Sequence, residues 1–317
     1  MSNIDIINDA IRKYIEENEV NDISELCVIN NSTNLLLEMP IRSDKSKYRK
    51  RVSLKKNIKY VSEFLTLLNP EYNEYFYKRL EDGTFIFDKN GSSNAYSTYD
   101  MINKKRIIYI PVMNTIEDSF AIVHELMHDM NLSIEDSIYE NISRYYFTEG
   151  LSILMEYLFE DFLISKNIKD ARVNNDKIIV ATRIKAILTD FNLKLVNCYL
   201  ENGYVFESNI VDILGYYSED EIPYIICTLD EMVETGELTI ENEQRYVISS
   251  LISTYMYNRI IKEKKNIQEL FDMNELIQDK GFESILDYLG FDYNDTDLIP
   301  EAYDLLRSNY KKYIKSR

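Results

Sequence analysis

The chain has 317 residues, of which 45% are apolar, so it can bury a sizeable core as one large domain or as two lobes. Its formal net charge of −18 at pH 7 argues against nucleic acid as a partner, because phosphates would be repelled by most of the surface. One basic stretch, from Arg42 to Lys59, is the exception. It is typical of a solvated helix face, with an anion or partner site as the alternative.

Two further observations bear on the cellular compartment. No stretch approaches the roughly 20 apolar residues that span a bilayer, and no basic region precedes an apolar run at the N-terminus. Cys27, Cys198 and Cys227 are far apart, odd in number and set in apolar or helical surroundings, which favours free core thiols in a reducing environment. We therefore expect a cytoplasmic protein that does not enter a membrane.

The apolar pattern predicts a mainly helical protein with one small sheet. Helical periodicity runs through 4–18, 51–69, 116–130, 134–165, 176–199, 219–235, 241–264 and 297–314. Short runs rich in β-branched and aromatic residues predict strands at 84–87, 95–99 and 106–110. Asn90 and Gly91 suggest a turn between the first two. Either 94–99 or 106–112 could form an exposed edge that holds an extended peptide by backbone hydrogen bonds.

The predicted helix at 116–130 carries both histidines of the chain, in the run from His124 through Glu125 to His128. Side chains at positions i and i+4 project from one helix face, so the two imidazoles can bind one metal ion. Glu125 would lie next to the open position of the metal. There it could take a proton from a bound water whose pKa the metal lowers to about 7. The sequence therefore predicts the metal helix of a zinc hydrolase.

A zinc hydrolase needs a third protein ligand, and no histidine remains to supply it. Glu149 is the best-placed carboxylate, because it lies in an apolar helical stretch where an ionised side chain is costly unless it is paired or bound to a metal. Ser152 and Glu156 follow on the same helix face. Glu156 would accept a hydrogen bond from a ligand histidine and fix its tautomer; the alternative is an ordinary exposed helix glutamate. Two imidazoles and one carboxylate suit zinc best.

The HExxH helix, followed by Glu149, Ser152 and Glu156 at these spacings, resembles the metal site of the M3 peptidases, the group of thimet oligopeptidase and oligoendopeptidase F. The likeness covers roughly residues 50 to 315 and includes a strand and turn at 110–118 and a tyrosine-bearing helix at 246–259. It implies that Glu149 is the third zinc ligand. It also implies a mainly α, zincin-like (gluzincin) catalytic domain at 51–317, with a small β-sheet before the HExxH helix and an N-terminal helical segment at 1–50.

The chain departs from the family pattern at several positions. Met127 stands where the family usually has glycine, and no histidine follows residue 128. The family has a histidine near its C-terminal tyrosine helix that helps to stabilise the transition state. Gln244 replaces one of the paired family tyrosines, which leaves Tyr246 as the oxyanion donor, with a core aromatic as the alternative. The chain is also about half the length of a full oligopeptidase, and a protein partner could complete the substrate channel.

These residues predict a zinc-dependent metallopeptidase that binds one zinc ion and hydrolyses oligopeptides. Glu125 would be the general base and Tyr246 would stabilise the oxyanion. Two other readings remain open. The protein could be a catalytically weak or inactive zinc-peptidase-like protein with a binding or regulatory role, or it could hydrolyse amides other than peptides on the same scaffold.

Overall fold

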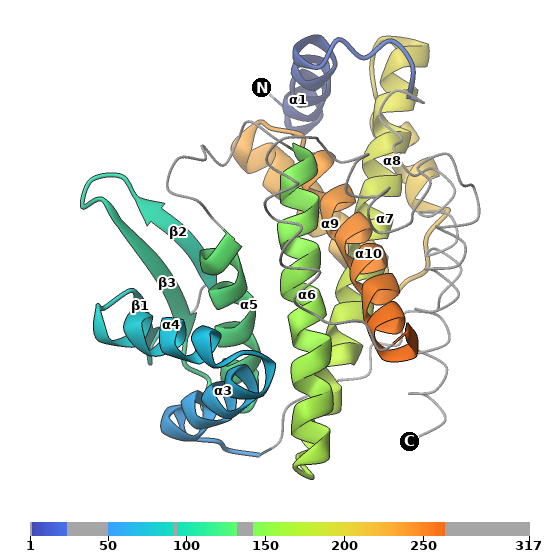
Figure 1. Ribbon diagram of the computed structural model, residues 1–317. Coiled ribbons are helices and arrows are strands. Elements are labelled where there is room, and N and C mark those ends of the chain that lie inside the picture. The colour runs from blue at the N-terminus through green and yellow to red at the C-terminus, as the bar shows by residue number, and fades with distance from the viewer. Residues whose placement is uncertain (1, 24–49, 92–93, 132–141, 264–317) are drawn as a thin grey trace. The chain divides into compact units, whose positions relative to one another are not determined.

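The computed structural model describes residues 2–23, 50–91, 94–131 and 142–263, which fall into two compact units (Figure 1). The first unit contains 2–23 and 179–251, and the second contains 50–178 and 252–263 apart from the gaps just given. Two long helices, α7 (Val173–Asn202) and α10 (Glu241–Glu263), have residues in both units. The predicted division into 1–50 and 51–317 stays a prediction.

The second unit contains the predicted sheet, formed by β1 (Phe85–Asp88), β2 (Tyr96–Asp100) and β3 (Lys105–Pro111). The strand order is β1-β3-β2, with β1 parallel and β2 antiparallel to β3. The expectation that 106–112 could form an edge is wrong, because β3 pairs on both sides. The other predicted candidate, 94–99, corresponds to β2, which lies at one edge of the sheet. The turn at 89–90 is present but does not join paired strands. Alternating patterns identify strands but not their neighbours.

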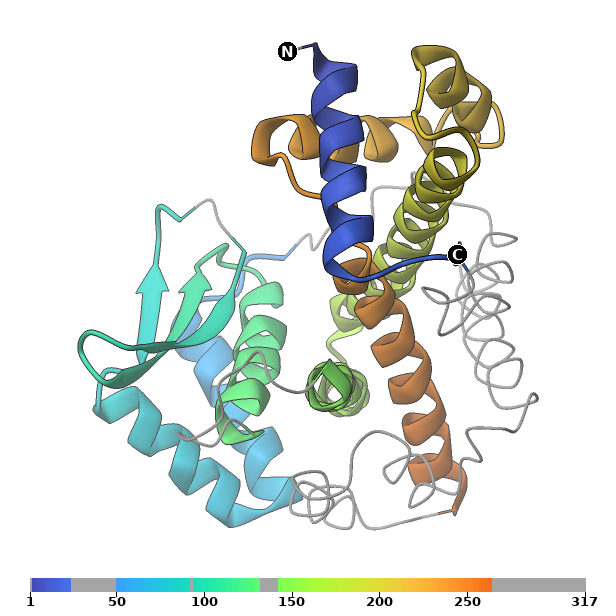
Figure 2. The same ribbon diagram turned by 90° about the horizontal axis from the view of Figure 1, so that it is seen from above.

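Four α-helices lie wholly within the second unit. They are α3 (Leu54–Leu68), α4 (Pro70–Glu81), α5 (Glu117–Asn131) and α6 (Ile142–Ser165), and a short 3-10 helix η2 (Lys169–Arg172) follows. Helix α5 packs against β3 and against α6, and seen from above it lies between the sheet and α6 (Figure 2). The sequence prediction missed α4. Pro70 is the first residue of this helix, where proline is favoured, and the Asn69 side chain caps its N-terminus.

The core of the second unit is aromatic and aliphatic. Phe159 of α6 contacts Phe64 of α3 and Phe120 of α5, with ring centroids 5.1 and 5.2 Å apart. Helix α6 is buried on almost all sides between Leu151 and Glu160. A helix that is apolar all round must lie inside the protein. Any ionised side chain on α6 therefore needs a partner.

The first unit is helical throughout its described residues. It comprises α1 (Asn3–Glu17), α8 (Glu207–Leu214), α9 (Ile222–Thr235) and the parts of α7 and α10 that lie within 179–251. Its core includes Ile11, Phe191 and Ile225, all fully buried. Asn8 joins α1 to the loop after α7, because its amide donates to the carbonyl oxygen of Val205 (2.9 Å) and accepts from its N–H (2.7 Å). The short helix α8 was not predicted.

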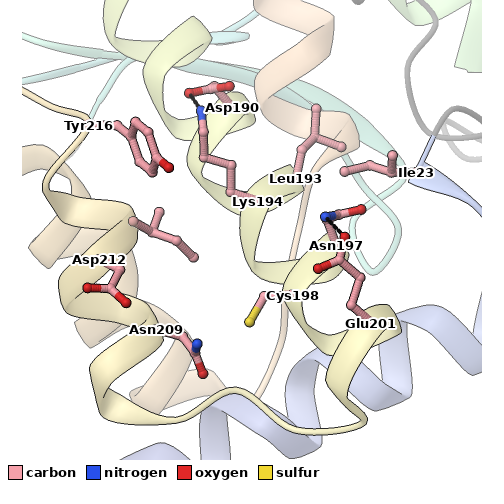
Figure 3. Close-up of a pocket in the computed structure, with 11 residues that line it drawn as sticks. Ile23, Asp190, Leu193, Lys194, Asn197, Cys198, Glu201, Asn209, Asp212 and Tyr216 are labelled. Atoms are coloured by element: carbon pink, nitrogen blue, oxygen red, sulfur yellow. Dashed lines mark hydrogen bonds and ion pairs between the residues drawn. The ribbon is translucent and has the colours of Figure 1, made fainter.

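A cavity of about 550 Å³ opens between α7 and α8 in the first unit (Figure 3). Cys198 of α7 lines it, and so do four polar side chains of α7 that form two pairs. Lys194 pairs with Asp190, and Asn197 donates to Glu201 (2.9 Å). These four groups are therefore already satisfied within the protein.

The predicted helical class is confirmed, and the helices predicted around 4–18, 51–69, 116–130, 176–199, 219–235 and 241–264 are present. The segment predicted at 297–314 lies outside the described residues. Cys198 and Cys227 are free thiols, as predicted, but the expectation that they lie in the core is wrong, because Cys198 is half-buried and Cys227 is exposed. Cys27 is outside the described part. Lys55, Lys56 and Lys59 of the basic stretch are exposed on α3. Among the residues that the structure describes, none of the helices combines the length and apolar character that a membrane span requires.

Candidate metal centre

The start of α5 is held by the buried carboxylate of Asp118. Its Oδ1 accepts from the N–H of Met113 (2.9 Å), and its Oδ2 accepts from the N–H of Asn114 (3.1 Å). The Asn57 side chain of α3 also donates to Oδ2 (3.3 Å). A carboxylate in the first turn is favoured by the helix dipole. The chain between β3 and α5 is therefore fixed, which sets the direction in which α5 leaves the sheet.

The other end of the HExxH segment is held by Asp129, which directly follows His128 and is 1% exposed. Its Oδ2 accepts from the Tyr75 hydroxyl (2.6 Å) and from Arg79 Nε (2.9 Å), both on α4. Its Oδ1 pairs with Arg106 of β3 (3.1 Å), which also donates to the Asp129 carbonyl. Burial and the Asp129 charge raise the pKa of Tyr75 to about 12. This buried network ties α5 to both α4 and the sheet.

His124 and His128 of α5 meet Glu149 of α6. Their Nε2 atoms lie 3.1 Å apart. One oxygen of Glu149 lies 3.3 Å from His124 Nε2, and the other lies 3.1 Å from His128 Nε2. The three side chains thus form a cluster that is compatible with a metal site. The helical spacing predicted the facing of the two imidazoles, and the packing of α5 on α6 brings the carboxylate to them.

The protonation of this cluster reflects its burial. Glu149 is 2% exposed, and burial alone would raise its pKa. The charge of His124, with a smaller contribution from His128, outweighs burial, so the pKa of Glu149 lies well below its ordinary value. Burial lowers the pKa of His124, but Glu149 and Glu156 more than offset it, so that pKa is raised well above its ordinary value. Glu149 is therefore kept ionised, which is the state in which a carboxylate binds a metal.

A metal ion fits these residues on two counts. Tetrahedral zinc with bonds of about 2.1 Å separates its ligand atoms by about 3.4 Å, close to the distances between the cluster atoms. Glu149 Oε1 is buried and has no hydrogen-bond partner, which is unusual because buried polar atoms are nearly always paired. A cation coordinated by this oxygen would remove the free-energy cost of burying it without a hydrogen bond. The donor set, two imidazoles and one carboxylate, belongs to the ligands that divalent transition metals prefer.

Glu156 and Ser152 of α6 support His124 from outside the cluster. Glu156 Oε1 lies 2.6 Å from His124 Nδ1, and Ser152 Oγ donates to the His124 carbonyl (3.2 Å). In the neutral imidazole that binds a metal, a proton on Nδ1 that is donated to Glu156 leaves the Nε2 lone pair directed at the cluster. The second oxygen of Glu156 accepts from Asn174 Nδ2 (2.7 Å). Nothing in the sequence pattern pointed to Asn174, because it lies on another helix, 18 positions after Glu156.

Glu125 projects from the same helix as the two histidines and is 7% exposed. Burial raises its pKa, and the nearby histidines only partly counteract this. A carboxylate with a raised pKa is a better proton acceptor than one in water.

Tyr246 belongs to the first unit, whereas the cluster belongs to the second. It is half-buried on α10, with Lys185 and Arg245 5.5 and 5.4 Å from its ring centroid. The structure brings together His124, Glu125, His128, Glu149 and Glu156; the part assigned to Tyr246 stays a proposal.

Comparisons with known proteins point to peptidases. The chain has a TM-score of 0.62 at 12% identity with a protein named as an oligoendopeptidase F, covering 95% of this chain and 57% of that one. It has a TM-score of 0.58 at 13% identity with PZ peptidase A bound to an inhibitor, covering 95% and 58%. A protein from Chlamydophila abortus named as a peptidase gives 0.57 at 14% identity, covering 96% and 55%. No family model and no curated protein matches the sequence.

At these identities the comparisons show the fold. The mainly helical architecture with a small three-stranded sheet is that of oligoendopeptidase-like proteins, which confirms the predicted fold class. The chain spans little more than half the length of the solved structures that it matches.

Proposed function

We propose that the chain is a zinc-dependent metallopeptidase that hydrolyses the peptide bonds of oligopeptides. The observation that carries the proposal is the buried carboxylate of Glu149, which faces two imidazoles and leaves one oxygen without a hydrogen-bond partner. The fold shared with peptidases supports the same reaction class. His124, His128 and Glu149 would hold the ion. Zinc bound there supplies Lewis-acid polarisation of the scissile carbonyl and lowers the pKa of water to about 7.

Glu125 is the proposed general base. It lies one residue after a ligand histidine, and its raised pKa suits a group that must take a proton near neutral pH. It would accept the proton of the attacking water and pass it to the nitrogen of the leaving amine. Glu156 would keep His124 in the tautomer that presents Nε2 to the ion.

Two further groups complete the proposal. The Tyr246 hydroxyl would donate to the developing oxyanion, an interaction worth a few kcal/mol when it is preorganised. Strand β2 is an edge of the described sheet and would hold an extended peptide by backbone hydrogen bonds without demanding a sequence. A protein partner could complete the substrate channel. A cytoplasmic location remains part of the proposal.

Metal content and peptide cleavage, measured on wild type and Glu125→Gln, test this function. We expect about one zinc ion per chain in both proteins. Cleavage of a quenched fluorescent peptide library should fall at least about 100-fold in the variant, as general bases contribute roughly 10²- to 10⁴-fold. Glu117→Gln is the matched control on α5, because its half-buried carboxylate pairs with Lys177 outside the metal cluster; it should retain both zinc and cleavage.

The other outcomes separate the alternatives. Zinc in both proteins without cleavage by wild type would favour the binding or regulatory protein. Cleavage of simple amides but not of peptides would favour a different amide hydrolase. A wild-type protein that takes up no metal would overturn the site assignment.

A further inference from the structure

The metal centre has a third layer of side chains, reached through Glu156. This carboxylate uses its two oxygens for two different partners: Oε1 lies 2.6 Å from His124 Nδ1, and Oε2 accepts from Asn174 Nδ2 at 2.7 Å. Asn174 lies in the first turn of α7, in the same compact unit as the cluster. The chain of contacts therefore runs from α7 through α6 to a ligand histidine on α5.

We propose that Asn174 is a positioning residue of the metal centre, which orients the Glu156 carboxylate so that His124 presents Nε2 to the ion. This inference rests on the proposed zinc site. The final torsion of a glutamate is broad and has no sharp minima, so the carboxylate plane is free unless both oxygens are held. With Asn174 bonded to one oxygen, the other is fixed in the direction of His124.

The chemistry of an amide suits this position better than a charged donor would. Asn174 is neutral, so it holds the carboxylate without cancelling its charge. An arginine or lysine there would form an ion pair with Glu156 and weaken the attraction between Glu156 and the imidazole. Glu156 thus keeps its full charge for His124, which raises the basicity of the ligand nitrogen.

Burial makes the arrangement specific. Asn174 is 5% exposed and Glu156 is 9% exposed, so water competes little for either group. A buried hydrogen bond whose partner is removed leaves an unsatisfied group, and here that group is the carboxylate that contacts His124. Loss of Asn174 should therefore be felt at the metal, two contacts away, and not only as a loss of stability.

The test is the zinc affinity of Asn174→Leu, measured by competition with a chromophoric chelator. Outer-shell partners are worth roughly 10- to 100-fold in metal affinity, and a group one bond further out should be worth about three- to tenfold. The matched control is Asn8→Leu, which removes an equally buried asparagine (5% exposed) in the first unit. Both variants should melt at lower temperature, but only Asn174→Leu should bind zinc more weakly.

A double-mutant cycle with Glu156→Ala identifies the route of the effect. If Asn174 acts through Glu156, Asn174→Leu should change zinc affinity in the wild-type background but not in the Glu156→Ala background. An affinity within twofold of wild type, or an equal loss in both backgrounds, would overturn the inference. Wild-type zinc uptake, together with the loss of cleavage in Glu125→Gln, is scored separately. The proposed function can therefore stand while this inference fails, and a wild type without zinc overturns both.

Discussion

Glu160 is a buried carboxylate outside the metal cluster whose ionisation should make the protein less stable at neutral pH. It is 8% exposed on α6, where it accepts from the N–H of Asn175 (3.0 Å) and is only weakly compensated by the charge of Arg172. Burial raises its pKa from 4.5 to about 8. Between these two pH values the folded state holds a proton that the unfolded chain has lost. The free energy of unfolding therefore falls as pH rises from 4.5 to 8 and levels off above it.

The size of the effect follows from the pKa difference. One unit of pKa corresponds to about 1.4 kcal/mol, so the ionised carboxylate costs up to about 5 kcal/mol above pH 8. Glu160→Gln keeps an oxygen that can accept from Asn175 and removes the charge. Relative to wild type, the variant should gain about 1.4 kcal/mol at pH 5.5 and about 4 kcal/mol at pH 7.5, a rise of about 2.5 kcal/mol across two pH units.

Urea denaturation followed by far-ultraviolet circular dichroism, in the presence of chelator and at several pH values between 5.5 and 8.5, measures this gain. Chelator removes any contribution from metal binding, which would itself depend on pH. Glu81→Gln, an exposed glutamate of α4 in the same unit, is the matched control and should follow wild type at every pH. If the gain of Glu160→Gln does not grow with pH, Glu160 is not held in its neutral form by burial, and the reasoning is refuted.

Two other substitutions test the support and the chemistry of the site. Asp129→Ala should lower the free energy of unfolding by about 2–3 kcal/mol, because it removes the buried carboxylate that accepts from the Tyr75 hydroxyl and pairs with half-buried Arg79 and Arg106. A loss below about 1 kcal/mol in urea denaturation would contradict this. Tyr246→Phe should lower kcat by about 100-fold, with zinc content unchanged, if the Tyr246 hydroxyl stabilises the oxyanion. The control Tyr216→Phe, at an exposed tyrosine, should leave kcat unchanged. If kcat of Tyr246→Phe stays within threefold of wild type, Tyr246 is a packing residue instead.

Much of the fold could be predicted because helices are local. Their periodicity and end signals lie within single segments, which is why α1, α3, α5, α7, α9 and α10 appear near their predicted positions. The errors have equally physical causes. Pro70 follows the end of α3 and is the first residue of α4. The sequence prediction treated this proline only as a helix terminator and therefore missed the helix that it begins. The pairing of β1 with β3 joins segments separated by β2, and such long-range pairing leaves no mark in an alternating pattern.

The same division between local and distant contacts applies to the site. The facing of His124 and His128 follows from four-residue spacing, and the choice of Glu149 followed from the cost of a carboxylate on an apolar helix. Asn174 could not be found in this way, because its contact with Glu156 depends on how α7 meets α6. The network around Asp129 is hidden for the same reason, since it draws on α4 and β3.

Helix α6 shows what the cost of burying a charge can and cannot predict about functional residues. Glu149, Glu156 and Glu160 fall at i, i+7 and i+11, so they form one stripe on an otherwise buried helix. The cost of burying a carboxylate is offset differently for each of them. Glu149 faces two imidazoles, and Glu156 has a polar partner at both oxygens. Glu160 accepts from one N–H, and its pKa is raised to about 8. A stripe of carboxylates on an apolar helix thus indicates that partners exist, but only their three-dimensional neighbours decide which carboxylate stays charged. The two that stay close to imidazoles are the ones we assign to the metal centre, and the third is the one whose removal should stabilise the protein.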